Sequence, residues 1–385
     1  MRFLDRIVYV DHSATTCIKK EVLDEMLPYF NELYGNPSSM YELGIKSREK
    51  IEECRNKICN LIEAKEKEEI YFTSGGSESN NMIIKGIAYA NRNKGNHIIT
   101  TKIEHKAVLN TCKELEKDGF EVTYLDVQQN GLVNINDVRK AVKKNTILIS
   151  VMFANNEVGT IEPIKEIASL ARFKGIYFHT DAVQAIGNIK INVSDLGIDA
   201  MSISAHKFYG PKGIGVAYIR KGVNFIPLIN GGSQENSKRA GTENVAGIVG
   251  MTKAMEIAFS NLENYNFKLL NLRNNFIDKI KEKIPEVIFN GDLENRLSGN
   301  INFYIPNING KNLLTLLNME GMCASSGSAC NLAEPSYVLK ALGKSNEIAS
   351  NSIRLTFGDE NTEADVEFII DKIVVAVNKL KEPVK

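Results

Sequence analysis

Short apolar runs alternate with segments of helical spacing through the first half of the chain, and this alternation predicts the fold. Strand-like runs are expected at residues 70–72, 98–100, 121–125, 146–153, 176–179 and 200–205. Apolar residues recur at helical spacing between them, near residues 77–91, 105–117, 135–143 and 163–173. Strands and helices that take turns in this way indicate an α/β fold with a mainly parallel sheet covered on both faces.

The two ends of the chain show other patterns. Residues 19–34 and 47–61 have helical spacing, and Pro28 is expected to kink the first of these helices. One long helix is expected over residues 251–283, followed by helices among short strand-like segments. A chain of 385 residues is long enough for two domains. We predict a large domain over residues 16–260 and a smaller α/β domain formed by residues 1–15 and 261–385.

Charge and hydropathy exclude several classes of function. The 47 basic and 47 acidic side chains cancel, so no overall field favours nucleic acid or an anionic membrane. No apolar run approaches the roughly 20 residues that cross a bilayer, and the first residues lack the apolar core of a signal peptide. We expect a cytoplasmic protein without nucleic-acid or membrane partners.

The cysteines do not form a metal or disulfide pattern. The chain has six, and none forms a C-x-x-C pair: Cys17, Cys54, Cys59, Cys112, Cys323 and Cys330. Their scatter fits neither a zinc ribbon nor a disulfide framework, so we expect thiols in a reducing compartment and no metal. Most of them are expected to be buried packing residues, Cys323 included.

Polar clusters follow the ends of several predicted strands. They comprise residues 73–78, His105, Asn155-Asn156, Asp181 and Lys207. In parallel sheets, ligands bind beyond the carboxyl ends of the strands. We therefore expect these clusters to share one site.

Lys207 stands where a predicted strand opens into the glycine-rich segment 210–215. Glycine tolerates unusual backbone angles, so the lysine is expected on a tight turn rather than on a helix face. A lysine in this position can form a Schiff base with pyridoxal phosphate (PLP); the alternative is a solvated surface lysine. Asp181 could keep the ring nitrogen of PLP protonated, the alternative being a helix cap. Gln184 and Asn156 are candidates to bond the ring hydroxyl oxygen.

The cluster at residues 73–78 lies between a strand and a helix. Free amides at a helix N-terminus bind phosphate, so Gly76 and Ser77 are candidates for the PLP phosphate; the alternative is an ordinary capping box. The cluster matches neither G-x-x-x-x-G-K-[ST] nor G-x-G-x-x-G, which disfavours ATP and NAD. His105, at another junction of strand and helix, could stack on a ring and move protons near neutral pH.

Two further residues lie in the C-terminal third. Cys330 ends the small-residue stretch 325–330, a setting that suits an exposed nucleophile. Arg354 lies inside a strand pattern, where its guanidinium could clamp a substrate carboxylate; the alternative is a structural ion pair.

In combination these motifs resemble those of the cysteine desulfurases of nitrogen fixation and iron–sulfur assembly, class V enzymes of PLP fold type I. The resemblance covers nearly the whole chain and rests on residues 11–16, 35–39, 73–78, 104–108, 155–159, 180–185, 204–215, 239–244, 325–330 and 353–355. It implies a homodimer that converts L-cysteine to L-alanine. The sulfur would remain as a persulfide on Cys330, in the smaller domain, and pass to an iron–sulfur scaffold or another acceptor protein.

The resemblance also implies a role for each matching residue around PLP. Lys207 would hold PLP covalently, Asp181 would pair with the ring nitrogen, and Gln184 and Asn156 would contact the ring oxygen. The phosphate would be bound by Gly76, Ser77, Ser204, His206 and, from the partner subunit, Thr242.

Other residues would act on the substrate. Arg354, helped by Asn36, would bind the carboxylate of L-cysteine. Freed Lys207 would remove the Cα proton, and the Cys330 thiolate would attack the substrate sulfur with His105 as proton donor or acceptor. After Cys330 the chain is shorter than the usual link of the family, and Tyr337 stands where histidine is common.

Two other functions stay open. The chain could be a selenocysteine lyase or another class V PLP lyase, although Cys330 favours desulfuration. It could also be a sulfur-carrier or regulatory protein on an inactive PLP scaffold, which the presence of Lys207, Asp181 and His105 disfavours.

Overall fold

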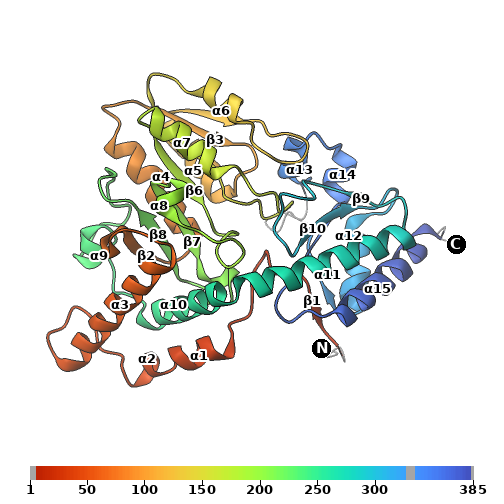
Figure 1. Cartoon of the computed structure of the whole chain (residues 1–385), viewed down its shortest axis with the longest axis horizontal. Coiled ribbons are helices and arrows are strands. Elements are labelled where there is room, and N and C mark those ends of the chain that lie inside the picture. The colour runs from red at the N-terminus through yellow and green to blue at the C-terminus, as the bar shows by residue number, and fades with distance from the viewer. Residues whose placement is uncertain (1–5, 327–333, 383–385) are drawn as a thin grey trace.

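A computed structural model describes residues 6–326 and 334–382 (Figure 1). Its main sheet has seven strands in the order β2-β8-β7-β6-β5-β3-β4. They are β2 (Ile70–Thr73), β3 (His97–Thr101), β4 (Glu121–Leu125), β5 (Thr146–Ser150), β6 (Tyr177–Asp181), β7 (Ala200–Ser204) and β8 (Gly215–Ile219). Strands β4, β3, β5, β6 and β7 pair in parallel, and β8 is antiparallel to both of its neighbours. The prediction of a mainly parallel sheet is confirmed.

Strand β8 was not predicted, because the glycine-rich segment 210–215, which leads into it, resembles an extended turn. It forms a hairpin with β7 and also pairs with β2, so Gly215 lies opposite both Ser204 and Thr73. A Cβ atom on Gly215 would lie 2.7 Å from the Cα atom of Gly75. Only glycine permits this approach, which brings the segment after β2 beside the segment after β7.

Helices cover both faces of the main sheet. They are α3 (Glu42–Leu61), α4 (Gly76–Ala90), α5 (Lys106–Lys117), α6 (Ile135–Ala141), α7 (Ile164–Phe173), α8 (Val193–Leu196) and α10 (Val245–Ser260). Successive strand residues face opposite sides: Ile98 packs in the cluster that holds α4 and α5, whereas Ile99 packs in the cluster that holds α3, α7 and α10. Shorter elements are η1 (Lys67–Glu69), η2 (Ala205–Lys207) and α9 (Gln234–Ser237).

Two predicted helices are divided. The N-terminal one is split into α1 (Lys20–Met26) and α2 (Pro28–Asn31), with the break at the predicted proline. The helix predicted over residues 251–283 is wrong in its extent: α10 ends at Ser260, and α11 (Leu262–Lys283) follows it along the molecule (Figure 1). The backbone of Asn261 leaves the helical region, with φ −118° and ψ 13°, and helical spacing alone does not reveal one such residue.

The C-terminal part forms a second sheet in the order β12-β10-β9. Its strands are β9 (Ile288–Phe289), β10 (Asn300–Tyr304) and β12 (Ile353–Thr356), and β1 (Val8–Tyr9) pairs with β11 (Met322–Cys323) beside it. The surrounding helices are α11, α12 (Gly310–Met319), α13 (Tyr337–Ala341), α14 (Asn346–Asn351) and α15 (Glu363–Lys381). This part has a core cluster of its own, which includes Phe276 and Phe303. The separate cluster supports the predicted division into two domains, which stays a proposal.

None of the helices in the described part of the chain combines the length and the hydropathy that a membrane span requires.

Candidate active site

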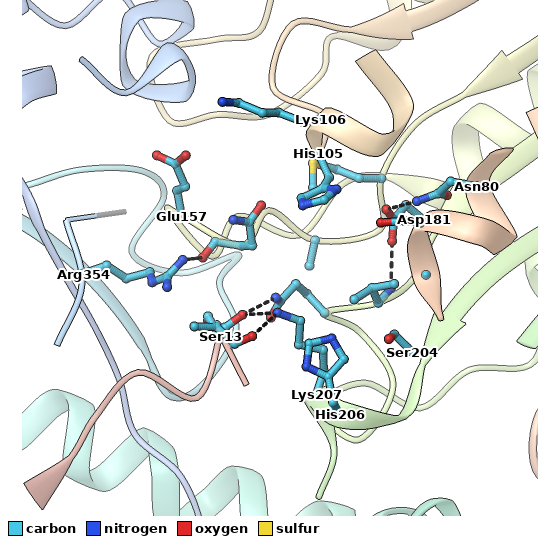
Figure 2. Close-up of a pocket in the computed structure, with 18 of the residues that line it drawn as sticks. Ser13, Asn80, His105, Lys106, Glu157, Asp181, Ser204, His206, Lys207 and Arg354 are labelled. Carbon is cyan, nitrogen blue, oxygen red and sulfur yellow. Dashed lines mark hydrogen bonds between the residues drawn. The ribbon is translucent and has the colours of Figure 1, made fainter. Parts of the chain in front are cut away.

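A cavity of about 340 Å³ lies at the carboxyl ends of the parallel strands, and Arg354 of β12 lines it from the smaller sheet (Figure 2). Its walls include most of the residues that the sequence singled out: Gly76, Ser77, His105, Asn156, Asp181, Gln184, Ser204, His206, Lys207 and Arg354. Parallel strands bring their carboxyl ends to one edge, so residues far apart in sequence meet there.

One end of the cavity is the N-terminus of α4. Gly75 precedes the helix with φ 148°, and among the described residues no side chain caps the helix. The capping-box alternative is therefore wrong, because Glu78 accepts a hydrogen bond from the Ser74 amide and pairs with Arg239 instead. A Cβ atom on Gly76 would lie 2.6 Å from Val183 Cγ2. Glycine thus keeps a narrow space open in front of free amides, an arrangement suited to a phosphate group.

Asp181 ends β6 and is almost fully buried. Its Oδ2 atom accepts a hydrogen bond from Asn80 Nδ2 at 2.7 Å, and Oδ1 accepts one from the Val183 amide at 3.0 Å. Two donors at these distances hold the carboxylate in one orientation, facing the cavity (Figure 2). Asn80 was not predicted, although its position four residues after Gly76 places both on one face of α4.

Lys207 ends the short 3₁₀ turn η2, directly after β7. Its Nζ atom donates to the carbonyl oxygens of Ser13 and Ala14 at 2.6 and 2.7 Å (Figure 2). The Ser13 oxygen also accepts from Gln184 Nε2 at 2.9 Å. Lys207 is therefore bonded inside the cavity and is not the solvated surface lysine of the alternative. The two backbone carbonyls were not predicted, because side-chain motifs give no sign of them.

His105 caps the N-terminus of α5, with its Nδ1 atom accepting from the Ala107 amide at 3.1 Å. In the neutral ring the proton therefore resides on Nε2. Burial lowers the pKa of His105, and the positive charges of Lys207 and Lys106 lower it further against the opposing effect of Asp181. His105 is therefore a neutral N–H donor at physiological pH.

His206, on the other side of Lys207, contacts Thr15 Oγ1 through Nδ1 at 3.1 Å. Burial lowers the pKa of His206 to about 4. Neither His206 nor His105 adds a positive charge to the cavity at neutral pH, so the positive charge there comes from lysine and arginine.

Arg354 enters the cavity from β12 and is 1% exposed. Its Nη1 atom donates to the Asn156 carbonyl oxygen at 2.9 Å, and Nη2 pairs with Asp11 Oδ1 at 2.6 Å. The structural ion pair, which was the alternative to a clamp for a substrate carboxylate, is thus present. The Nε atom is buried without a partner in the described part of the chain, so the guanidinium keeps a donor for an anionic ligand.

Two predicted site residues, Asn36 and Thr242, do not line the cavity. Asn36 is exposed, and its side chain accepts from the Ser38 amide. Thr242 is exposed in a separate depression beside Arg239. Cys330 lies outside the described residues. The expectation that Cys323 is buried is wrong, because it is partly exposed at the end of the two-residue strand β11. The roles assigned to Asn36, Thr242 and Cys330 stay predictions.

Three buried glutamates on the loops around the cavity were not predicted: Glu104, Glu157 and Glu162. Burial raises the pKa of each, well above its usual range for Glu104 and to about 8 for Glu162. Glu104 accepts from the Met152 amide beneath the cavity, and Glu157 lines the cavity itself. Glu104 and Glu157 fall within segments that carry the resemblance, but the sequence did not reveal their burial, because burial of a single carboxyl group depends on the tertiary fold.

We expect Glu162→Gln to stabilise the protein in a pH-dependent way. The raised pKa means that the unfolded chain ionises Glu162 before the folded chain does, so stability falls as the pH rises from about 4.5 to about 8. Glutamine keeps the acceptor for the Val133 amide. Urea unfolding should show a gain of about 2–4 kcal/mol at about pH 8 and little gain at about pH 5. The exposed Glu166→Gln on α7 is the control, and an equal gain at both pH values would contradict the expectation.

With this geometry in place, comparisons with known proteins identify the family. The class-V aminotransferase model matches residues 8–369. The chain is 52% identical to Cysteine desulfurase IscS of Clostridium botulinum (strain Hall), over 98% of this chain and 96% of that protein. It is 53% identical to Cysteine desulfurase IscS of Methanosarcina thermophila, over 98% of this chain and 93% of that protein. A solved NifS-like protein superposes with a TM-score of 0.92 at 38% identity, covering 97% of this chain and all of that one.

The fold and cavity are those of a PLP enzyme of fold type I. The chain belongs to the class-V aminotransferases and, within them, to the cysteine desulfurases.

Members of this family depend on PLP, and the cavity fits that group. The uncapped amides of α4 and the space at Gly76 suit a phosphate. Asp181 suits a protonated ring nitrogen, and Asn156 has a buried Oδ1 atom without a partner among the described residues. Lys207 reaches the same cavity between Ser13 and His206 (Figure 2).

Proposed function

We propose that this protein removes sulfur from L-cysteine, releasing L-alanine and leaving a persulfide on Cys330. The arrangement of Lys207 and Arg354 carries the proposal, because both cations face one cavity that also holds Asp181 and a free helix N-terminus. A lysine that can exchange its bond, an anchored carboxylate and an arginine for the substrate are what a PLP enzyme acting on an amino acid requires.

The cofactor would be held by residues of the large domain. Gly76, Ser77, Ser204 and His206 would bind its phosphate, and Asp181 would bond its ring nitrogen. When bound, PLP supplies an electron sink that stabilises negative charge on the substrate carbon. Asn80 orients Asp181 for this bond, because its Nδ2 atom occupies the outer carboxylate oxygen.

Lys207 would move the substrate proton. The carbonyl oxygens of Ser13 and Ala14 stabilise the protonated Nζ atom, so they favour its uptake of a proton from the substrate Cα. His105 lies across the cavity and offers its Nε2 proton as a hydrogen-bond donor. Both predicted proton-transfer roles require a ring that carries a second proton on Nδ1, and that proton would break the cap of α5. The neutral ring therefore acts as a hydrogen-bond donor.

Arg354 would orient the substrate through its carboxylate. The guanidinium is already fixed by Asp11 and the Asn156 carbonyl, so little rotamer freedom is lost when it binds an anion. Asn36 is proposed to assist from the exposed loop after α2.

The sulfur would leave by attack of the Cys330 thiolate on the substrate sulfur. A sulfur–sulfur bond forms while the sulfur–carbon bond breaks, and the electron pair stays with the carbon, which then takes a proton to give alanine. The persulfide sulfur would pass to an iron–sulfur scaffold or another acceptor protein. The free thiols of Cys17, Cys54, Cys59, Cys112 and Cys323 support a reducing, cytoplasmic location.

We propose a homodimer in which Thr242 completes the phosphate site of the partner subunit. The phosphate end of the cavity adjoins an open hollow lined by Gly75, Ser77 and Lys212, and Thr242 of the same chain is not part of that lining. Thr242 lies instead in the adjoining depression, which shares Ser74 with the hollow. Large apolar side chains are exposed near the N-terminus, among them Leu27, Phe30, Tyr34, Met40 and Tyr41. Burial of such side chains against a second copy would stabilise a dimer.

Mixed dimers test this arrangement. Lys207→Ala and Thr242→Asp should each be inactive alone, the second because a carboxylate repels the phosphate. Dimers that combine one copy of each should regain turnover, because the intact Lys207 then receives Thr242 from the other subunit. If Thr242 acted within its own chain, mixing would restore nothing.

A direct assay tests the activity itself. The purified protein should absorb visible light and should release alanine and sulfide from L-cysteine in the presence of a reductant. Comparison with L-selenocysteine separates a desulfurase from a selenocysteine lyase. A protein that binds PLP but forms neither alanine nor persulfide from L-cysteine would contradict the proposal.

A further inference from the structure

Glu157 is a carboxyl group in the cavity wall to which the proposed reaction assigns no role. It is 2% exposed and lies near Arg354 (Figure 2). Its backbone is fixed on both sides, because its amide donates to Asn155 Oδ1 at 2.8 Å and its carbonyl accepts from Asn302 Nδ2. A side chain on so rigid a loop can hold a second segment in place.

The segment that Glu157 holds is the start of α13. The Ser336 hydroxyl donates to Glu157 Oε2 at 2.5 Å. Ser336 Oγ also accepts from the Leu339 amide at 3.1 Å and so caps the helix. Ser336 is 1% exposed. The Ser336 bond partly offsets the effect of burial, which raises the pKa of Glu157.

Ser336 is six residues after Cys330 in the sequence. On the preceding side, the backbone of Ser325 pairs with the backbone of Arg354. The described residues on both sides of Cys330 are therefore bonded to residues that line the cavity, Arg354 before it and Glu157 after it. The hydroxyl of Tyr337 adds a bond to the Glu104 carbonyl oxygen at 2.8 Å.

We propose that Glu157 is a positioning residue for sulfur transfer. Glu157 holds Ser336 against the wall of the substrate cavity. Because Ser336 is only six residues after Cys330, this contact limits where Cys330 can lie. This inference rests on the proposed function, since it needs Cys330 as the acceptor of sulfur. An error of about 1 Å in the position of a reacting group can slow a reaction on the order of 100-fold, so loss of one anchor should slow persulfide formation and leave earlier steps unchanged.

Two serine variants form a matched pair for the test. Ser336→Ala removes a helix cap and the bond to Glu157, whereas Ser345→Ala removes the equivalent cap of α14, where Ser345 accepts from the Ile348 amide at 3.2 Å. Single turnovers of the holoenzyme with L-cysteine should be followed by absorbance and by persulfide labelling. Ser336→Ala should slow persulfide formation about 10-fold, with the concentration dependence of the absorbance change unaltered. Ser345→Ala should match the wild type in both readouts.

Variants of Glu157 complete the test. Glu157→Ala should reproduce the defect of Ser336→Ala, and Glu157→Gln should recover most of the rate, because an amide oxygen still accepts from the serine hydroxyl. The double variant Glu157→Ala/Ser336→Ala should be no slower than the slower single variant, as for two groups that act through one contact. If Glu157→Ala does not fold, the serine pair alone decides.

Three outcomes would overturn the inference. In the first, Ser336→Ala forms persulfide as fast as Ser345→Ala does. In the second, the double variant slows persulfide formation by the product of the two single effects. In the third, Glu157→Ala weakens the absorbance response to L-cysteine as strongly as it slows persulfide formation. Each of these outcomes can be read only when the wild-type protein forms the persulfide. A wild type that forms no persulfide instead overturns the proposed function, and with it this inference.

Discussion

Lys207→Ala should lower the turnover of L-cysteine by at least about 1000-fold, because it removes both the covalent link to PLP and the group that takes the Cα proton. PLP should remain bound, since the uncapped N-terminus of α4 and Asp181 are untouched by the change. The measurements are the rate of alanine formation and the visible spectrum. Borohydride reduction of the wild type, followed by peptide mapping, should place the fixed chromophore on Lys207.

Lys221→Ala is the matched control. Lys221 is exposed and pairs with Glu66, so its loss should leave turnover unchanged. A reduced chromophore mapped to Lys212 or Lys221 would contradict the assignment of Lys207.

The sequence predicted most of the cavity because its residues follow strands of a parallel sheet. Asp181 ends β6, Lys207 follows β7 and Gly76 follows β2, so their convergence results from the topology alone. The prediction of Arg354 as a site residue required only a strand pattern that contains a single arginine. Alternation of short strands and helices thus determines both the fold and the edge at which the ligand binds.

The remaining features depend on contacts that no local pattern encodes. The carbonyl oxygens of Ser13 and Ala14 hold Lys207 from a distance of almost 200 residues in the chain. Strand β8 begins with glycine because the close contact of Gly215 with Gly75 excludes a side chain at position 215. The burial of Glu157 and its bond to Ser336 depend on how the smaller sheet packs against the larger one.

The assignment of Cys330 as the nucleophile is supported by the behaviour of the other cysteines. None of Cys17, Cys54, Cys59, Cys112 and Cys323 lines the cavity. Burial raises the pKa of every one of them, to about 11 for Cys17, where Glu360 contributes, and to about 12 for Cys112. A thiol with a raised pKa is a poor nucleophile at neutral pH, because little of it is thiolate.

Cys330→Ala should therefore separate the two halves of the reaction. The absorbance change on addition of L-cysteine should persist, since Lys207, His105 and Arg354 are intact, whereas persulfide should be absent and sulfide release should fall at least about 100-fold. Cys323→Ala is the control: it should keep full activity and cost about 1 kcal/mol of stability, as for a small partly buried side chain. Labelling of the persulfide, followed by peptide mapping, measures both variants. An inactive Cys323→Ala beside an active Cys330→Ala would assign the nucleophile to Cys323, whose strand β11 pairs with β1 a few residues before Ser13.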